Sequence, residues 1–599
     1  MRFITSCIVA AISAIGVALF IGCSPRALAG KEQPEPATPA KITEKPSAQP
    51  ETQVSPTTSP SIAEEKLRLR PRARYDRTKD EAPAMLQNAA PARIGIARKP
   101  RMRQAPGCGY AGRTASPRCA ERAPHFNTES YDHITENRFH RALDKPLSTF
   151  SIDVDAASYS NIRRFISRNS LPPADAVRIE EMINYFSYAY RQPHSNEPFS
   201  INTELGSCPW NQAHRLVHIG LQGKKVETRN LPPSNLVFLL DVSGSMNSTG
   251  KLPLLKSAMK LLVKNLRPAD QIAIVVYAGA AGLVLPSTCG DNKEAIIEAL
   301  DNLQAGGSTA GGAGINLAYT VAQENFLQQG NNRIILATDG DFNVGASSDG
   351  EMVRLIEAKR KAGVFLTVLG FGTGNYKDSK MEKLADKGNG NYAYIDNILE
   401  AKKVLVNEIG ATLLTIAKDV KIQVEFNPSK VQAYRLIGYE NRQLRAEDFN
   451  DDTKDAGELG AGHTVTALFE IIPAGVTTEL VKVDPLKYQR QPLRSPANSS
   501  SELLTVKFRY KNPSAAKSRL IVHALEAAGA GSYSENFAFS AAVAGFGMLL
   551  RDSAHKNDLT YDKVLTLARQ GAGRDAHGYR AEFIRLVERA QLLAGSKRS

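Results

Sequence analysis

The sequence has few of the residues that mark several classes of protein. Only 6 of its 599 residues are cysteine, and none follows the spacing of a zinc site, which excludes a disulfide-built scaffold. Hydrophobic residues make up 42% and charged residues 23%, as in ordinary soluble domains, which excludes a mostly disordered chain and a multi-span membrane protein. At about 100–200 residues per domain, the length predicts about three to five folded units.

Acidic residues are scarce in one tract, and this tract accounts for most of the net charge of +14. Between Lys66 and Arg122 there are 15 basic residues and 4 acidic ones. Residues 24–128 are also rich in Pro, Ala, Ser and Thr, which predicts a disordered basic linker. Such a linker is either attracted to anionic lipid headgroups or cell-wall polymers, or merely solvated. Because aromatic residues are not interleaved with the basic ones, the tract does not favour nucleic acid as a ligand.

Residues 1–23 have the layout of an export signal. Arg2 precedes an apolar run from Cys7 to Gly22 that is short for a membrane span. The run ends in Leu-Phe-Ile-Gly before Cys23, which resembles a bacterial lipobox and implies lipidation of Cys23. Cleavage after Ala29 and an uncleaved anchor are the alternatives. We therefore expect an exported cell-envelope protein, lipid-anchored at the outer membrane or the periplasmic face.

Export makes disulfide bonds possible. Cys108 and Cys119 lie 11 residues apart in the predicted linker and could close a small loop. Cys208 and Cys289 fall in segments that are expected to fold, and we predict that both are buried.

Order is expected from residue 129 onward, in an α+β unit over 129–230, an α/β unit over 231–414, a β-rich unit over 415–530 and a helical unit over 531–599. In the second unit, unbroken apolar segments alternate with amphipathic ones, which predicts a doubly wound, mostly parallel sheet buried on both faces. The expected strands are 236–240, 272–276, 334–337 and 364–369, and the expected helices are 252–266, 293–303, 315–328 and 351–362. Because neither flank has enough strands for its own sandwich, we expect the flanks to pair, with the α/β unit inserted between them.

Two further segments carry specific expectations. Asp155 stands where a cap is needed for a helix over 156–168, and a second helix is expected over 175–186. Asp153 and Asp155 could instead ligate a metal, although roles at a strand end and a helix cap are favoured. The apolar run 537–550 is too short to span a bilayer and predicts a core helix.

Oxygen-bearing side chains follow the expected strands at one edge of the sheet. Asp241, Ser243 and Ser245 leave the first central strand, and Asp339 follows a later one. Thr309 lies in a Gly-rich segment before a helix. Ligands of parallel sheets bind at the carboxyl ends of the strands, and carboxylates and hydroxyls are the donors that Mg²⁺, Mn²⁺ or Ca²⁺ prefer. The pattern therefore predicts a divalent-metal site there.

This set is similar to the metal-ion-dependent adhesion site of von Willebrand factor type A domains. The resemblance implies that Ser243, Ser245 and Thr309 bind Mg²⁺ through their hydroxyls, and that Asp241 and Asp339 bind it directly or through water, with Ser308 as the alternative to Thr309. It also implies a protein partner that offers a carboxylate to the metal. Four other segments, at 150–155, 184–186, 434–442 and 549–553, resemble a bacterial family of secreted type A proteins with a C-terminal domain of unknown function.

Enzyme motifs are not found in the sequence. The segment 370–375 lacks the third glycine of a dinucleotide fingerprint, and 306–314 lacks the Lys-Ser/Thr of a P-loop. We therefore expect a binding protein and assign no catalytic residue. The alternatives are a Mg²⁺-dependent enzyme acting on envelope polymers, a type A domain whose metal only braces its loops, and a nucleic-acid binder, which export disfavours.

Overall fold

The structure is a computed structural model that describes residues 129–152, 155–194, 197–308, 311–340, 349–374, 376–477, 500–513, 515–527 and 533–596. All of these residues belong to one unit of the chain, Ser116–Ser599. The predicted signal segment with Cys23, the basic linker with Cys108 and Cys119, and Thr309 lie outside the described residues.

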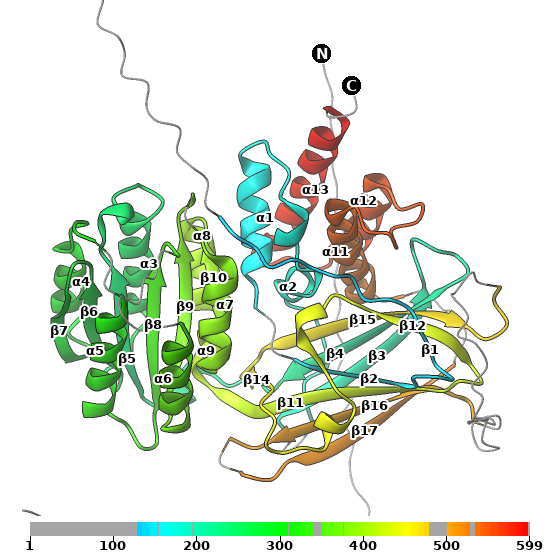
Figure 1. Ribbon diagram of the computed structural model, residues 1–599, viewed down its shortest axis with the longest axis horizontal. Helices are drawn as coiled ribbons and strands as arrows, with labels where there is room; N and C mark the ends of the chain where they lie inside the picture. The colour runs from blue at the N-terminus through cyan, green and yellow to red at the C-terminus, as the bar shows by residue number, and fades with distance from the viewer. Residues whose placement is uncertain are drawn as a thin grey trace, which may run out of the picture. The chain divides into compact units, whose positions relative to one another are not determined.

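A six-stranded sheet forms the centre of the α/β unit, in the order β10-β9-β8-β5-β6-β7 (Figure 1). All neighbouring strands are parallel except β7, which runs antiparallel to β6. The strands are β5 (Ser234–Asp241), β6 (Gln271–Tyr277), β7 (Ala281–Cys289), β8 (Asn331–Thr338), β9 (Val364–Phe371) and β10 (Tyr392–Ile395). This confirms the predicted α/β fold class with a mostly parallel sheet.

Helices cover both faces of this sheet, and the side chains of β5 show why. Leu236, Phe238 and Leu240 pack with the α3 side, whereas Val237 and Leu239 pack with the α5 side. Since successive side chains of a strand point to opposite faces, a strand buried on both faces must be apolar throughout. The helices are α3 (Leu252–Lys264), α4 (Lys293–Asp301), α5 (Gly311–Glu324), α6 (Asp349–Lys361), α7 (Asp378–Lys387), α8 (Ile398–Lys402) and α9 (Ile409–Leu413).

The strands on either side of the α/β unit form two antiparallel sheets, in the orders β1-β12-β15-β4-β3 and β13-β2-β11-β16-β17. Strand β4 from before the insertion pairs with β15 from after it, and β2 pairs in the same way with β11, which confirms the expected pairing of the two flanks. Their inner faces share one apolar core.

The strands of the first sheet are β1 (His140–Arg141), β3 (Phe199–Ser207), β4 (Arg215–Gly223), β12 (Val431–Ile437) and β15 (Thr464–Pro473). Those of the second are β2 (Leu147–Ser151), β11 (Thr415–Phe426), β13 (Gln443–Leu444), β16 (Glu502–Lys511) and β17 (Arg519–Glu526), with β14 (Gly457–Gly460) paired to β11.

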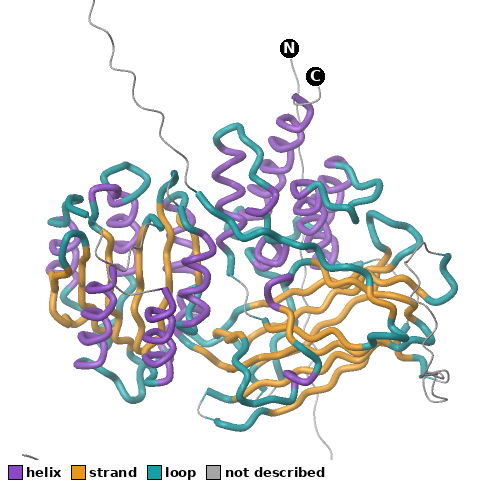
Figure 2. The backbone as a smooth tube through the Cα atoms, viewed as in Figure 1, coloured by secondary structure: helices purple, strands orange, loops and turns teal. Residues whose placement is uncertain are grey.

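A further apolar core joins helices from the amino-terminal and the carboxy-terminal parts of the described chain (Figure 1), and these helices lie above the sandwich strands in Figure 2. The helices are α1 (Ala157–Ser167), α2 (Ile179–Asn184), α11 (Glu535–Arg551), α12 (Tyr561–Gln570) and α13 (Tyr579–Ser596). Helix α11 contains the apolar run 537–550 and is buried along most of its length, as predicted. In the described part of the chain, no helix combines the length and the apolar character that a membrane span requires.

Four sequence-based expectations differ from the structure. The second predicted helix is limited to α2, because Val177 and Arg178 before it are extended. Asp155 does not cap α1; its carboxylate accepts hydrogen bonds from Tyr392 N–H and from Arg442. Cys208 is buried as predicted, but Cys289 is exposed at the end of the edge strand β7. Strands β7 and β10 and helix α7 were not predicted, since Pro286 and the polar composition of α7 obscure their periodicity.

Candidate metal centre

The carboxyl edge of the parallel sheet brings two predicted site carboxylates together. Asp241 is the last residue of β5, and Asp339 directly follows β8. Strand β8 lies next to β5 in the sheet. Both aspartate side chains are fully buried, and burial, with a smaller contribution from the charge of Asp339, raises the pKa of Asp241. The hydroxyls of Ser243 and Ser245 lie 3.1 Å apart in the loop that leaves β5. The structure therefore gathers four of the five predicted residues at one edge.

In the described part of the chain, only neutral groups donate hydrogen bonds to Asp241. Its Oδ1 accepts from Ser243 N–H at 2.9 Å, and its Oδ2 accepts from the hydroxyls of Tyr277 at 3.2 Å and Thr338 at 3.1 Å. Burial raises the pKa of Asp241 above its ordinary value, although the hydrogen bonds from Ser243 and Thr338 lower it. Among the described residues, no cation pairs with this carboxylate, so its charge lacks a counter-ion.

The Gly-rich segment before α5 packs directly on the loop after β5. Gly306 N–H donates to Val242 O at 2.8 Å, and Gly244 N–H donates to Gly307 O at 3.0 Å. Gly307 has a φ of +81°, and a Cβ there would lie 3.2 Å from the nitrogen of Gly279. A glycine is needed for this close approach. The contact places Ser308, which is exposed, next to the candidate site, and Thr309 follows it in the chain.

Asp339 is paired with a lysine that the sequence analysis missed. Lys251 Nζ lies 2.7 Å from Asp339 Oδ2, and the lysine side chain is only 9% exposed. Lys251 directly precedes α3, whose amino end carries a partial positive charge and disfavours a cation. A lysine at the amino end of a helix is therefore a signal in the sequence that a carboxylate lies nearby.

The donor set fits a divalent cation. Two buried carboxylates and two hydroxyls offer hard oxygen atoms, and the charge of Asp241 lacks a counter-ion. Mg²⁺, Mn²⁺ and Ca²⁺ prefer such donors, whereas Zn²⁺ prefers His and Cys. Asp241, Ser243, Ser245 and Asp339 would hold the ion, together with Thr309 or Ser308.

A second group of acidic side chains, Asp155, Glu181 and Glu382, also lies close enough to hold a metal. Two arginines already fill it. Arg442 donates to Glu382 at 2.9 Å and to Asp155 at 3.3 Å, and Arg178 donates to Glu181. The alternative of Asp155 as a metal ligand is therefore not favoured by its surroundings, because guanidinium groups already neutralise these carboxylates.

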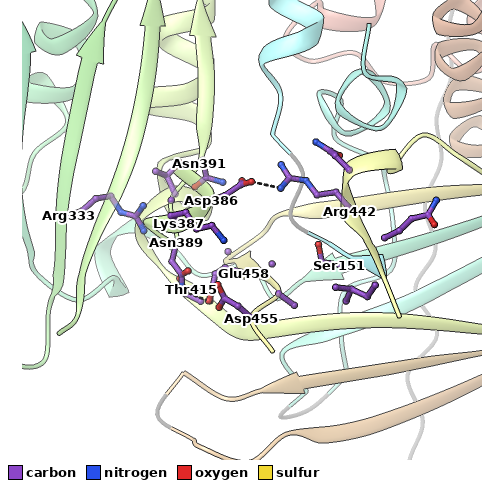
Figure 3. Close-up of a pocket in the computed structure, with 18 residues that line it drawn as sticks. Ser151, Arg333, Asp386, Lys387, Asn389, Asn391, Thr415, Arg442, Asp455 and Glu458 are labelled. Carbon is purple, nitrogen blue, oxygen red and sulfur yellow. Dashed lines mark hydrogen bonds and ion pairs between the residues drawn. The ribbon is translucent and has the colours of Figure 1, made fainter. Parts of the chain in front are cut away.

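A cavity of about 260 Å³ lies at the opposite edge of the parallel sheet, where Arg333 stands near the start of β8 (Figure 3). Residues of the loop after α7, such as Asn389, line it together with Glu458 of β14. The ion pair between Arg442 and Asp386, 2.6 Å long, crosses its upper part in this view. None of the predicted site residues lines this cavity.

Three family models match the chain. Residues 235–406 match the von Willebrand factor type A domain, residues 125–218 match a model described as von Willebrand factor, and residues 411–593 match the C-terminal part of the uncharacterized protein YfbK. The class of protein is therefore a type A domain protein with an additional C-terminal domain, as the sequence motifs predicted.

The uncharacterized protein YfbK of Escherichia coli K12 is 45% identical over 470 residues, which cover 77% of this chain and 81% of that protein. The chain belongs to the YfbK family of von Willebrand factor type A proteins. Human inter-alpha-trypsin inhibitor heavy chain H4 is 32% identical over 162 residues, 26% of this chain and 17% of its own. A solved type A protein from Catenulispora acidiphila is 16% identical, with 66% of this chain and 91% of that chain covered and a TM-score of 0.37.

Proposed function

We propose that this type A protein binds a protein partner in the cell envelope through a divalent metal, Mg²⁺ or alternatively Mn²⁺ or Ca²⁺. Asp241, Ser243, Ser245, Thr309 and Asp339 hold the ion. The observation that carries the proposal is the buried carboxylate of Asp241, which receives hydrogen bonds only from neutral donors among the residues that the structure describes. A bound cation supplies the missing charge and offers an open coordination position to a carboxylate of the partner.

The surrounding groups prepare the site for this role. Ser243 N–H, Tyr277 and Thr338 hold the Asp241 carboxylate in one orientation, so little reorganisation is needed when the ion arrives. The loop that carries the two serine hydroxyls is fixed to the Gly-rich segment by two backbone hydrogen bonds. A rigid set of oxygen donors suits directional binding of a cation.

The proposed location follows from the amino-terminal segment. A lipid at Cys23 places the protein in the envelope, and the basic linker of residues 24–128 lies beside an anionic surface. Cleavage after Ala29 would give a secreted protein with the same binding domain. We propose binding and not catalysis, with no catalytic residue assigned and no nucleic-acid ligand.

The test is calorimetric titration of the full chain with Mg²⁺, comparing the wild type with Asp241→Asn. We expect binding by the wild type and none by the variant. Asp301→Asn is the matched control, because it removes a half-exposed carboxylate of the same domain that pairs with Lys260 outside the site. Equal Mg²⁺ binding by the wild type and Asp241→Asn would contradict the proposed site.

The partner is sought by crosslinking in intact cells that carry the wild type, Asp241→Asn or Asp301→Asn. We expect a crosslinked envelope protein that depends on Mg²⁺, disappears with Asp241→Asn and persists with Asp301→Asn. The same protein captured by Asp241→Asn in the presence of EDTA would overturn the adhesion role. Turnover of peptidoglycan by the wild type, lost in Asp241→Asn, would favour the enzyme instead.

A further inference from the structure

Lys251 occupies an unusual position for a lysine. It directly precedes α3, its side chain is only 9% exposed, and its Nζ lies 2.7 Å from Asp339 Oδ2. Burying an ammonium group costs free energy, and the amino end of a helix repels it, so only a strong compensating interaction keeps it there. The carboxylate of Asp339, itself fully buried, provides that interaction.

The neighbouring loop holds the lysine stem in place. Gly372 follows β9 with a φ of +76°, and a Cβ at this position would lie 2.4 Å from both Cγ and Cε of Lys251. The stem therefore lies directly on the backbone of Gly372, where only a glycine leaves it room. The hydroxyl of Tyr394 donates to Gly372 O at 2.6 Å and fixes this loop. The lysine is enclosed between the loop and the site.

We infer that Lys251 is a resident cation of the proposed metal centre. It is the counter-ion of Asp339 when no metal is bound, and it stays beside the ion when one is bound. This inference rests on the proposed metal site. Its ion pair with Asp339 is made through Oδ2 of that carboxylate.

The charges at the site give this arrangement two consequences. Among the described side chains of the site, Asp241 and Asp339 carry two negative charges and Lys251 one positive charge, so a divalent ion changes the sum of these three charges from negative to positive. Lys251 therefore weakens metal binding by repulsion, because charges a few ångströms apart interact strongly in a buried site. It also makes the loaded site attract an anionic ligand, so the partner group that it selects is a carboxylate on an acidic surface.

The first test is titration of the full-length wild type, Lys251→Met and Lys256→Met with Mg²⁺. Lys251→Met keeps the length of the side chain, and we expect it to bind Mg²⁺ about tenfold more tightly than the wild type. Lys256→Met is the matched control, since Lys256 lies on the same helix and donates to the backbone of Asp301 outside the site. We expect its affinity to equal that of the wild type.

The outcomes separate the two proposals. Equal or weaker binding by Lys251→Met, with clear binding by the wild type, overturns the role of Lys251 and leaves the metal site standing. Failure of the wild type and of every variant to bind Mg²⁺, Mn²⁺ and Ca²⁺ overturns both. With saturating Mg²⁺, an NMR titration with N-acetyl-aspartate amide tests the ligand preference: we expect severalfold weaker binding to Lys251→Met, and equal binding overturns that preference.

A second measurement tests the pairing without metal and covers the case in which Lys251→Met does not fold. Thermal unfolding in EDTA compares Asp339→Asn with the double variant Asp339→Asn/Lys251→Met. Asp339→Asn leaves a buried ammonium without its carboxylate, so we expect the double variant to melt several degrees higher. A double variant that melts no higher than Asp339→Asn would show that Lys251 does not depend on Asp339.

Discussion

Two groups of buried or half-buried acidic side chains lie on the type A domain, and they differ in the groups that neutralise their charge. Where α7 meets the flanking segments, Asp378, Glu382 and Asp386 each accept a hydrogen bond from Arg178 or Arg442. Among the residues described at the carboxyl edge of the sheet, Lys251 pairs with Asp339, and Asp241 receives hydrogen bonds from neutral donors only. We infer from this difference that a buried carboxylate paired with a guanidinium group stabilises the fold, whereas a buried carboxylate without a cation can bind a metal.

The largest effect is expected from breaking the arginine-filled group. Arg178→Met leaves the buried carboxylates of Glu181 and Asp378 without their shared cation. We expect the free energy of unfolding, measured with urea, to fall by about 3–5 kcal/mol. Arg229→Met serves as the control, because Arg229 pairs with Glu227 in solvent and its loss should cost about 0–1 kcal/mol. A comparable loss of unfolding free energy in both variants would show that the buried ion pairs stabilise the fold no more than the exposed one.

The buried carboxylate of Glu470, on strand β15, extends the comparison to the sandwich. Burial raises the pKa of Glu470, but hydrogen bonds from His214 and Arg435 outweigh it and lower the pKa from 4.5 to about 2. Stability from a lowered pKa is present above the unfolded value and disappears as the pH falls through the folded value. We expect Glu470→Gln to be about 3 kcal/mol less stable than the wild type at pH 6, at 1.36 kcal/mol per pKa unit.

The difference in unfolding free energy between the wild type and Glu470→Gln should shrink as the pH falls from 4.5 to about 2, because the wild-type carboxylate then becomes protonated. Urea unfolding of both proteins across this pH range measures it. A difference that stays constant down to pH 2 would mean that the charge of Glu470 does not stabilise the fold.

At the candidate metal centre we expect that removing a carboxylate charge stabilises the fold in the absence of metal, the opposite of its effect at Glu470. In EDTA, Asp241→Asn removes a buried charge that has neutral hydrogen-bond donors only, so we expect the variant to be about 1 kcal/mol more stable than the wild type. With Mg²⁺ at about 100 times its Kd, the wild type should gain about 2.7 kcal/mol and the variant nothing. Thermal unfolding with and without Mg²⁺ measures both. A variant that is strongly destabilised in EDTA would place Asp241 with the structural carboxylates.

The smallest effect concerns the hydroxyl from the Gly-rich segment. Ser308 is exposed, so Ser308→Ala should change stability by less than about 0.5 kcal/mol. If Thr309 supplies the metal ligand, Thr309→Ala should weaken Mg²⁺ binding while Ser308→Ala leaves it unchanged. The reverse result in a calorimetric titration would assign the ligand to Ser308.

Much of the α/β unit could be predicted because its physics is local. Residues 236–240 of strand β5 are all apolar because helices cover both faces of the sheet, and this continuous apolar run can be recognised in the sequence. The same run marks the sheet edge at which Asp241 must lie. Strand β7 escaped prediction because it is a partly exposed edge strand that contains Pro286, and α7 because its core-facing residues are separated by many charged ones.

The partners of the buried charges could not be predicted in this way. Lys251 and Asp339 are 88 residues apart in the chain, and Arg178 and Asp378 are 200 apart. Periodicity describes the face of an element and not the element that covers it. Asp155 illustrates the error: its position suggested a helix cap, whereas its carboxylate binds Arg442 from a distant segment.

The sequence by itself determined the type A fold and the set of oxygen donors at one sheet edge, because the burial of a strand and the position of the loop after it depend on residues that are close together in the chain. The tertiary structure alone decided which carboxylates have a cation. That depends on contacts between segments far apart in the chain, and such contacts separate the paired acids of the domain junction from the carboxylate of Asp241 at the candidate metal centre.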